Sequence, residues 1–265
     1  MVGRIQQAGE TSWQEGFFGP LYGRVLAARL QTAGTLREAR LVRKLLGLRE
    51  GQAVLDCPCG QGRLAVQLAR MGIQVTGVDQ AAGYLATARR LARQEKVRLR
   101  PARREAGLHL VRADMRRIDF AGRFDAVVNW FSSFGYFSDD DNLLVARRAL
   151  EALRPGGRFL LELLNKSVLL GRLYDVHEET INGVRIVNRP RWDGRTNRLR
   201  DTWELSAGRL VERCPMEMRV FNGREIRALL KEAGFADIRL YAHAKGQAGP
   251  FTRHSARFIA VARRR

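Results

Sequence analysis

The sequence predicts an α/β fold in which helices cover both faces of a mostly parallel β-sheet. Apolar runs alternate with segments of helical periodicity between residues 53 and 165, and the apolar runs are continuous. Such strands are typical of parallel sheets, which are buried on both faces. The five expected strands comprise residues 53–58, 73–79, 108–114, 124–130 and 158–165.

Three helices are expected between these strands, at residues 62–72, 81–96 and 139–153. The first has apolar residues at helical spacing and ends at Gly72, a common helix stop. The last begins with Asp139, Asp140 and Asp141. Acidic side chains in a first turn interact favourably with the helix dipole, so the start of this helix is well defined.

Length and composition are those of a globular protein. The chain has 265 residues, of which 45% are hydrophobic and 28% charged, and no apolar run approaches the ~20 residues of a membrane span. Residues 1–16 lack the apolar core of a signal peptide, so we expect a cytoplasmic protein without membrane contact. Cys57, Cys59 and Cys214 are too few for a disulfide framework, and they lack the second pair that a zinc site needs, so we expect no metal.

The formal net charge of +20 has two interpretations. Most of the 47 basic residues are arginines, and they are spread over most of the chain. A compositional bias explains this pattern as well as a dedicated nucleic-acid surface does. We expect non-specific binding to polyanions in either case.

Polar residues stand at the carboxyl ends of the predicted strands. These ends are Asp56, Asp79, Asp114, Asn129 and Asn165. Because ligands bind at this edge of an open parallel sheet, we expect these side chains to surround one site.

The segment VLDCPCGQGRLAVQL, residues 54–68, contains a glycine-rich loop that suits a nucleoside ligand. Gly60 and Gly62 let the backbone approach the ligand, and Asp79 follows at the spacing of an acid that accepts from ribose hydroxyls. A nicotinamide or flavin would share these features. Asp56 would repel a pyrophosphate but would attract the ammonium group of an amino acid. S-adenosylmethionine joins a nucleoside to a cationic amino acid, and it is the ligand that satisfies both conditions.

Five segments resemble, in order and spacing, the motifs of the class I S-adenosylmethionine-dependent methyltransferases. They read VLDCPCGQGR, VTGVDQAAGYLATAR, LVRADM, FDAVVNWFSSFGYF and LRPGGRFLLELLN. The resemblance covers residues 17–165 and returns at 224–241 and 255–264. It implies a Rossmann-like, seven-stranded sheet. It also implies S-adenosyl-L-methionine as cofactor and S-adenosyl-L-homocysteine as product.

The resemblance also assigns cofactor contacts. The loop that contains Asp56, Cys57, Gly60 and Gly62 would hold the methionine end, and Asp79 would accept from the ribose hydroxyls. The side chains expected against the sugar or the adenine are those of Gln80, Tyr84 and Asp114, beside the backbone of Met115. The sulfonium region would be lined by Asn129, Trp130 and Phe131, and aromatic rings attract a sulfonium. Residues 17–30 resemble a segment that closes over the cofactor, with Tyr22 as its contact.

Residues 171–221 are expected to form an insertion after the fifth strand. Asn182-Gly183 and Asp193-Gly194 are turn signals, and residues 209–221 alternate as a half-buried strand does. With residues 200–206 as a neighbouring strand, we expect a small antiparallel sheet of about three strands. It resembles insertions in small-molecule methyltransferases, including some sugar N-methyltransferases, which wall the acceptor pocket or form a homodimer contact.

The resemblance thus implies three parts of the chain. We expect residues 1–50 to form an N-terminal helical cap, residues 51–170 and 222–265 the methyltransferase core, and residues 171–221 the insertion that borders the acceptor site. The core resumes at Asn222, where Glu225 follows at the spacing of a capping box.

Methyl transfer requires few catalytic side chains, because positioning supplies much of the rate. A base would help an amine or hydroxyl acceptor lose its proton, and the candidates are Tyr136, His177 and His243. None of the three is assigned as the base.

The acceptor is expected to be a small molecule that is methylated on an N or O atom. Enzymes that methylate the exocyclic amines of bases usually carry Asn/Asp-Pro-Pro-Tyr in the fourth motif, whereas this chain reads Asn129-Trp130-Phe131-Ser132. Two alternatives stay open: an RNA or protein methyltransferase, which the charge favours, and a non-catalytic S-adenosylmethionine-binding module. The intact Asp56, Gly60, Gly62 and Asp79 argue against the second.

Overall fold

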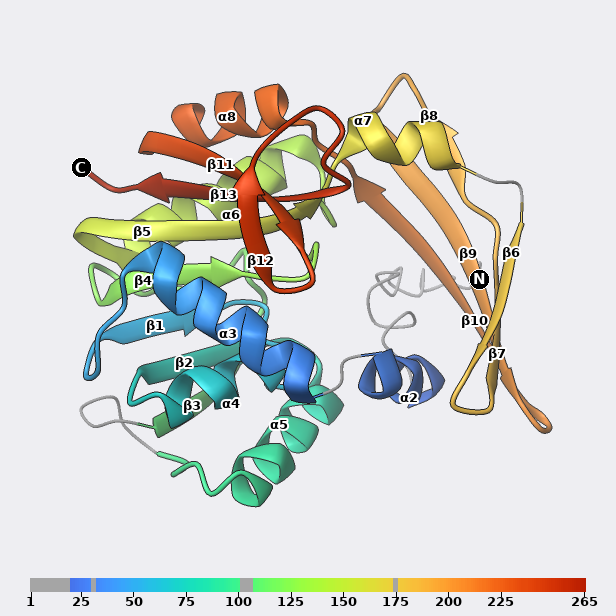
Figure 1. The fold of residues 1–265 in the computed structure, drawn as a ribbon, viewed down its shortest axis with the longest axis horizontal. Coiled ribbons are helices and arrows are strands. Elements are labelled where there is room, and N and C mark those ends of the chain that lie inside the picture. Colours follow the sequence, from blue (N-terminus) through green and yellow to red (C-terminus); the bar gives the residue numbers. More distant parts are fainter. Residues whose placement is uncertain (1–19, 30–31, 101–106, 174–175) are drawn as a thin grey trace, which may run out of the picture.

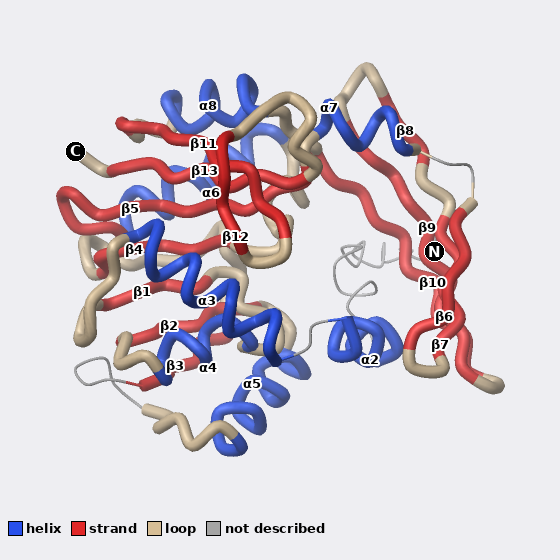
Figure 2. Tube along the Cα trace, in the orientation of Figure 1, coloured by secondary structure: helices blue, strands red, loops and turns tan. Residues whose placement is uncertain are grey.

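The protein contains two β-sheets that stand side by side (Figures 1 and 2). The computed structural model describes residues 20–29, 32–100, 107–173 and 176–265. The first part of the expected cap, residues 1–19, therefore lies outside the described residues. Within them, the large sheet has the strand order β12-β11-β13-β5-β4-β1-β2-β3, and the second sheet has the order β10-β9-β7-β6 with β8 paired to β9.

The five strands expected from apolar runs form the parallel part of the large sheet. They are β1 (Ala53–Asp56), β2 (Gln74–Asp79), β3 (Gly107–Arg112), β4 (Phe124–Asn129) and β5 (Leu153–Leu164). The last of these begins directly after the preceding helix, so residues 154–157, which were expected as a loop, belong to the strand.

Helices cover both faces of this sheet, as expected (Figure 1). One face is covered by α3 (Thr32–Leu46), α4 (Arg63–Arg70) and α5 (Ala82–Gln94), and the other by α6 (Asp139–Ala152) and α8 (Gly223–Glu232). The cap of α6 is Ser138, whose hydroxyl accepts from the Asp141 N–H at 3.1 Å. None of the helices in the described ranges combines the length and the apolar character of a membrane span.

The sheet ends in three antiparallel strands, which gives it one strand more than the expected seven. They are β11 (Ala236–Ala244), β12 (Gln247–Pro250) and β13 (Arg257–Arg263), and β13 pairs with β5. The additional strand is β12. It folds back on β11 because Lys245 and Gly246, both at positive φ, form a tight hairpin turn.

The insertion forms a five-stranded antiparallel sheet instead of the expected three strands. Its strands are β6 (His177–Ile181), β7 (Val184–Asn188), β8 (Arg191–Asp193), β9 (Arg198–Ala207) and β10 (Leu210–Arg219). The β6–β7 turn is the predicted Asn182-Gly183, with both residues at positive φ. Because β6 is mostly polar and β8 has only three residues, neither shows a clear apolar alternation.

Short helices join the second sheet to the large one. After β5 the chain forms α7 (Lys166–Leu169) and η1 (Leu170–Arg172) before it enters the insertion. From the N-terminal side, α2 (Pro20–Arg29) packs Leu21 and Val25 against apolar side chains of the second sheet. The second sheet is therefore held beside the carboxyl ends of the parallel strands.

Candidate functional site

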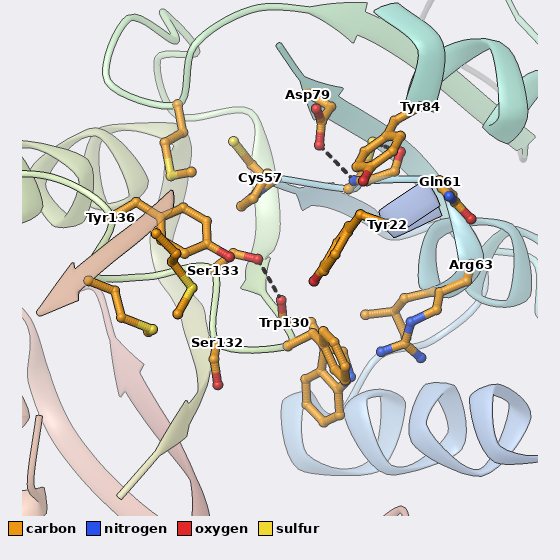
Figure 3. Close-up of a pocket in the computed structure, with 18 of the residues that line it drawn as sticks. Tyr22, Cys57, Gln61, Arg63, Asp79, Tyr84, Trp130, Ser132, Ser133 and Tyr136 are labelled. Carbon is orange, nitrogen blue, oxygen red and sulfur yellow. Dashed lines mark hydrogen bonds between the residues drawn. The ribbon is translucent and has the colours of Figure 1, made fainter. Parts of the chain in front are cut away.

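A cavity of about 580 Å³ lies between the carboxyl ends of the parallel strands and the second sheet (Figure 3). Most of the predicted cofactor contacts line it: Tyr22, Asp56, Cys57, Gly60, Asp79, Gln80, Tyr84, Asp114, Met115, Trp130 and Phe131. Gly62 and Asn129 do not line it. The tertiary structure thus gathers residues from β1, β2, α2, α5 and the segments that follow the parallel strands around one space.

The loop between β1 and α4 needs glycine at Gly62. This residue has a φ of 77° and is the N-cap of α4. A Cβ atom there would lie 2.6 Å from the Cβ of Ala88, so a larger residue would push α4 and α5 apart. Gly62 therefore shapes the loop without facing the cavity.

Asp79 fixes the same loop from the end of β2. Its Oδ2 accepts from the Gly60 N–H at 2.8 Å (Figure 3), and its Oδ1 accepts from the Ala81 N–H at 2.9 Å. Burial raises the pKa of Asp79. Each carboxylate oxygen has further lone pairs, so both can also accept from the adjacent hydroxyls of a ribose.

Asp56 is a buried carboxylate with an unsatisfied oxygen. Its Oδ2 has no hydrogen-bond partner within the described part of the chain. Burial raises the pKa of Asp56 to about 7, against the lowering effect of the Arg63 guanidinium. An unsatisfied buried acceptor is costly. The ammonium group of S-adenosylmethionine would supply both the missing donor and a positive charge, so the residues fit this cofactor.

Asp114 is held by an arginine that the sequence did not single out. Arg116 donates through Nε and Nη2 to the two carboxylate oxygens, with the shortest contact at 2.6 Å. Burial opposes ionisation, but the hydrogen bonds from Arg116 outweigh it, and the pKa of Asp114 lies below its usual range. The carboxylate is therefore ionised and fixed at the cavity wall.

The segment after β4 has strained backbone. Phe131 and Ser132 have φ values of 67° and 57°, in the left-handed region that non-glycine residues rarely adopt. The Phe131 ring lies close to Arg63 and Arg257, whose Cζ atoms are 5.2 and 5.4 Å from its centroid. Trp130 lines the cavity and donates from Nε1 to Glu38 at 3.2 Å.

Of the three catalytic candidates, the structure brings only Tyr136 into the cavity lining. Burial raises the pKa of Tyr136, so its phenol stays protonated at neutral pH. His177 lies on β6, 3.6 Å from Glu179, and is partly exposed. His243 is buried beneath the site, where its Nδ1 lies 3.1 Å from Oε1 of Glu162. His177 and His243 are therefore not placed to act as a base in this cavity.

Asn129 and Asn165 do not line the cavity, and their side chains contact other parts of the protein. The Asn129 amide lies 4.0 Å from the Met115 sulfur. Asn165 caps α7 and donates to the carbonyls of Arg253 and Ser255. The polar strand end at Asn165 thus joins two loops, which is a common use of asparagine.

Several lining residues carry charge or polarity that the sequence analysis missed. These are Arg63, Ser132, Ser133, Asn188, Asp201 and Arg257. Arg257 is paired with the buried Glu162 and donates to Ser132 Oγ at 2.8 Å. The sequence signal that could have indicated this ion pair is Glu162, which stands among leucines in the strand β5.

Known proteins with a methyltransferase domain are similar to this chain in sequence. Residues 54–157 match the family model described as a methyltransferase domain. The ubiquinone biosynthesis O-methyltransferase of Azorhizobium caulinodans is 34% identical over 142 residues, which cover 49% of this chain and 46% of that protein. The S-adenosyl-L-methionine-dependent Diels-Alderase iccD of Talaromyces variabilis is 29% identical over 208 residues, 75% of this chain and 59% of that protein. The chain spans about half the length of these curated relatives.

Solved structures share the fold over nearly the whole chain. The CcbJ methyltransferase from Streptomyces caelestis has a TM-score of 0.77 at 21% identity and covers 97% of this chain and 99% of its own. The sugar N-methyltransferase KedS8 from Streptoalloteichus has a TM-score of 0.63 at 19% identity and covers 100% and 98%. Residues 54–157 are therefore similar to a methyltransferase domain, and the chain has the Rossmann-like fold of S-adenosylmethionine-dependent methyltransferases.

Proposed function

We propose that this protein transfers a methyl group from S-adenosylmethionine to an N or O atom of a small molecule. The observation that carries the proposal is a cavity with two chemically different walls. Its core wall holds the charged and polar side chains of the family motifs, including Asp56 and Asp79, whereas Leu199, Met216 and Met218 of the second sheet line the other side.

The core wall would bind the cofactor. Asp56 would pair with the ammonium group, Asp79 would accept from the ribose hydroxyls, and Tyr84 and Asp114 would contact the adenine end. S-adenosylmethionine, when bound, supplies an electrophilic methyl group on a sulfonium. The protein's own part is to exclude water and to hold the acceptor in line with that methyl group.

The second sheet would bind the acceptor. On this basis the proposed division of the chain keeps residues 51–170 and 222–265 as the cofactor core and residues 171–221 as the acceptor wall. Tyr136 lies between the two walls, and its protonated phenol would donate a hydrogen bond and so help to orient the acceptor. The names of the solved relatives, which include an amino pentose methyltransferase and a sugar N-methyltransferase, support an acceptor of small size.

Isothermal titration tests the cofactor assignment. S-adenosylmethionine and S-adenosylhomocysteine should bind at micromolar concentrations, and NADH should not bind. Transfer of a labelled methyl group to a panel of small amines, phenols and alcohols then tests the reaction. Binding of NADH without binding of S-adenosylmethionine would show that the site serves a different nucleotide.

A further inference from the structure

One carboxylate stands on the acceptor wall, at a position where the strand pattern calls for an apolar residue. Along β9, Leu199 and Asp201 are buried, whereas Arg200 and Thr202 between and after them are exposed. Successive residues of a strand point to opposite faces, so Asp201 lies on the inner face with Leu199 and Trp203. All three line the cavity.

Asp201 is buried and firmly oriented. Only 6% of it is exposed. Its Oδ2 accepts from Asn188 Nδ2 at 3.0 Å and from Trp203 Nε1 at 2.8 Å. Two donors on the same oxygen hold the carboxylate in one orientation and favour its ionised form.

The second oxygen of Asp201 is unsatisfied. Its Oδ1 is buried and has no hydrogen-bond partner among the residues that the structure describes. Met216 lies directly opposite Asp201 on β10, and Met218 lies opposite Leu199, so the surroundings are largely apolar. This burial raises the pKa of Asp201. A buried acceptor without a donor is costly, and a buried negative charge without a counter-charge is more so.

We infer that Asp201 binds the acceptor through a protonated amine on that molecule. An ammonium group would donate to Oδ1 and would neutralise the carboxylate, whereas a hydroxyl would do only the first and a carboxylate ligand would be repelled. The apolar residues around Asp201 would contact the hydrocarbon part of the same acceptor. The inference rests on the proposed function, and it assigns the acceptor class as small molecules that carry a basic amine.

Three compounds with the same ring and different head groups test this inference: benzylamine, benzyl alcohol and benzoate. Their affinities for the S-adenosylhomocysteine-saturated protein can be measured by ligand-observed NMR at pH 7.5. We expect benzylamine to bind at least about tenfold more tightly than benzoate, with benzyl alcohol between them, because only the ammonium group both donates to Oδ1 and neutralises the carboxylate. Failure of the wild-type protein to bind benzylamine, or equal affinity for all three compounds, would overturn the inference.

The variant Asp201→Asn tests whether Asp201 causes the preference for benzylamine, because the substitution removes the charge and keeps the shape of the side chain. We expect it to abolish the preference for benzylamine while the affinity for S-adenosylhomocysteine stays within about twofold. The matched control is Glu204→Gln on the same strand, whose carboxylate pairs with Arg213 and does not line the cavity. It should behave as the wild type. A preference for benzylamine that survives in Asp201→Asn contradicts the inference. Failure of the wild-type protein to bind S-adenosylhomocysteine would instead contradict the proposed function.

Discussion

At the scale of single residues, burial determines what the carboxylates of the site can do. Asp56, Asp79 and Asp201 are all buried, and burial raises the pKa of each. Asp79 has two backbone donors, whereas Asp56 and Asp201 each have an unsatisfied oxygen. A cationic group of a ligand would therefore contribute most to binding at Asp56 and Asp201, because it would supply the hydrogen-bond donor that a buried carboxylate oxygen lacks there.

The variant Asp79→Asn should weaken the binding of S-adenosylhomocysteine by roughly tenfold or more. The ribose hydroxyls would lose a charged acceptor, which contributes about 1.5–3 kcal/mol. Isothermal titration measures the change, and Asp119→Asn, an exposed aspartate outside the cavity lining, is the control. Unchanged affinity in a folded Asp79→Asn protein would mean that Asp79 does not contact the ribose.

Cofactor affinity should rise with pH as Asp56 ionises. The pKa of Asp56 in the free protein is raised to about 7, so the carboxyl group is mostly protonated below this pH and must lose its proton to pair with an ammonium. The dissociation constant of S-adenosylhomocysteine should therefore fall between pH 6 and 8, by at most about tenfold per unit. The variant Asp56→Asn should bind more weakly and show a flat profile. If the affinity of the wild type depended on pH as little as that of the variant, Asp56 would not pair with the ammonium group of the cofactor.

At the scale of elements, turn and cap chemistry positions the segments around the site. Asn222 begins α8 with the capping box that the sequence predicts: its Oδ1 accepts from the N–H groups of Arg224 and Glu225, and Glu225 accepts from the Asn222 N–H. This cap lies where the chain leaves the second sheet. Within that sheet, the Asn182-Gly183 turn reverses the chain and so sets the pairing of β6 with β7.

Replacement of the cap residue should destabilise the protein measurably without removing the site. We expect Asn222→Ala to lower the free energy of unfolding by about 1 kcal/mol, because two backbone donors lose their acceptor. Urea unfolding followed by circular dichroism measures the change. The variant Asn222→Asp keeps an acceptor at the cap and should remain close to the wild type. Equal destabilisation by both variants would mean that another contact of Asn222 is responsible.

At the scale of the whole molecule, a cavity lies between two sheets, and the chain carries a large positive net charge. The net charge is +20, yet some arginines are engaged inside the protein, as Arg257 is with Glu162 and Arg116 with Asp114. The proposed homodimer contact stays a prediction. The exposed Leu210 and Val211, at the β9–β10 hairpin of the insertion, are the residues to test for it.

Binding to RNA should be weak, independent of sequence and steeply dependent on salt, if the acceptor is a small molecule. Contacts between arginines and phosphates release counterions, so the affinity falls as the salt concentration rises. Fluorescence anisotropy with several unrelated RNAs at low and physiological salt measures this dependence. A strong preference for one RNA that persists at physiological salt would instead support an RNA methyltransferase.

The order of strands and helices in the core could be predicted from the sequence, as could the edge at which the site lies. Continuous apolar runs, the glycine spacing and the capping residues are local signals, so β1 to β5 and the helices between them were largely placed correctly. The extra strand β12 and the short strands β6 and β8 were missed. A two-residue turn or a polar strand is stabilised by its pairing partner, and its own sequence gives little sign of it.

The acceptor wall was decided by the tertiary structure. The predicted contacts from Asp56 to Phe131 come from a single stretch of the chain and meet because parallel strands end at one edge. Asp201, by contrast, receives its donors from Trp203 and from Asn188 on another strand, and Arg257 reaches Glu162 from 95 residues away. The sequence by itself determined the fold and the cofactor edge, because periodicity and spacing are properties of neighbouring residues. The surroundings of each buried charge depend on strand register and on packing between distant segments, which only the folded chain defines.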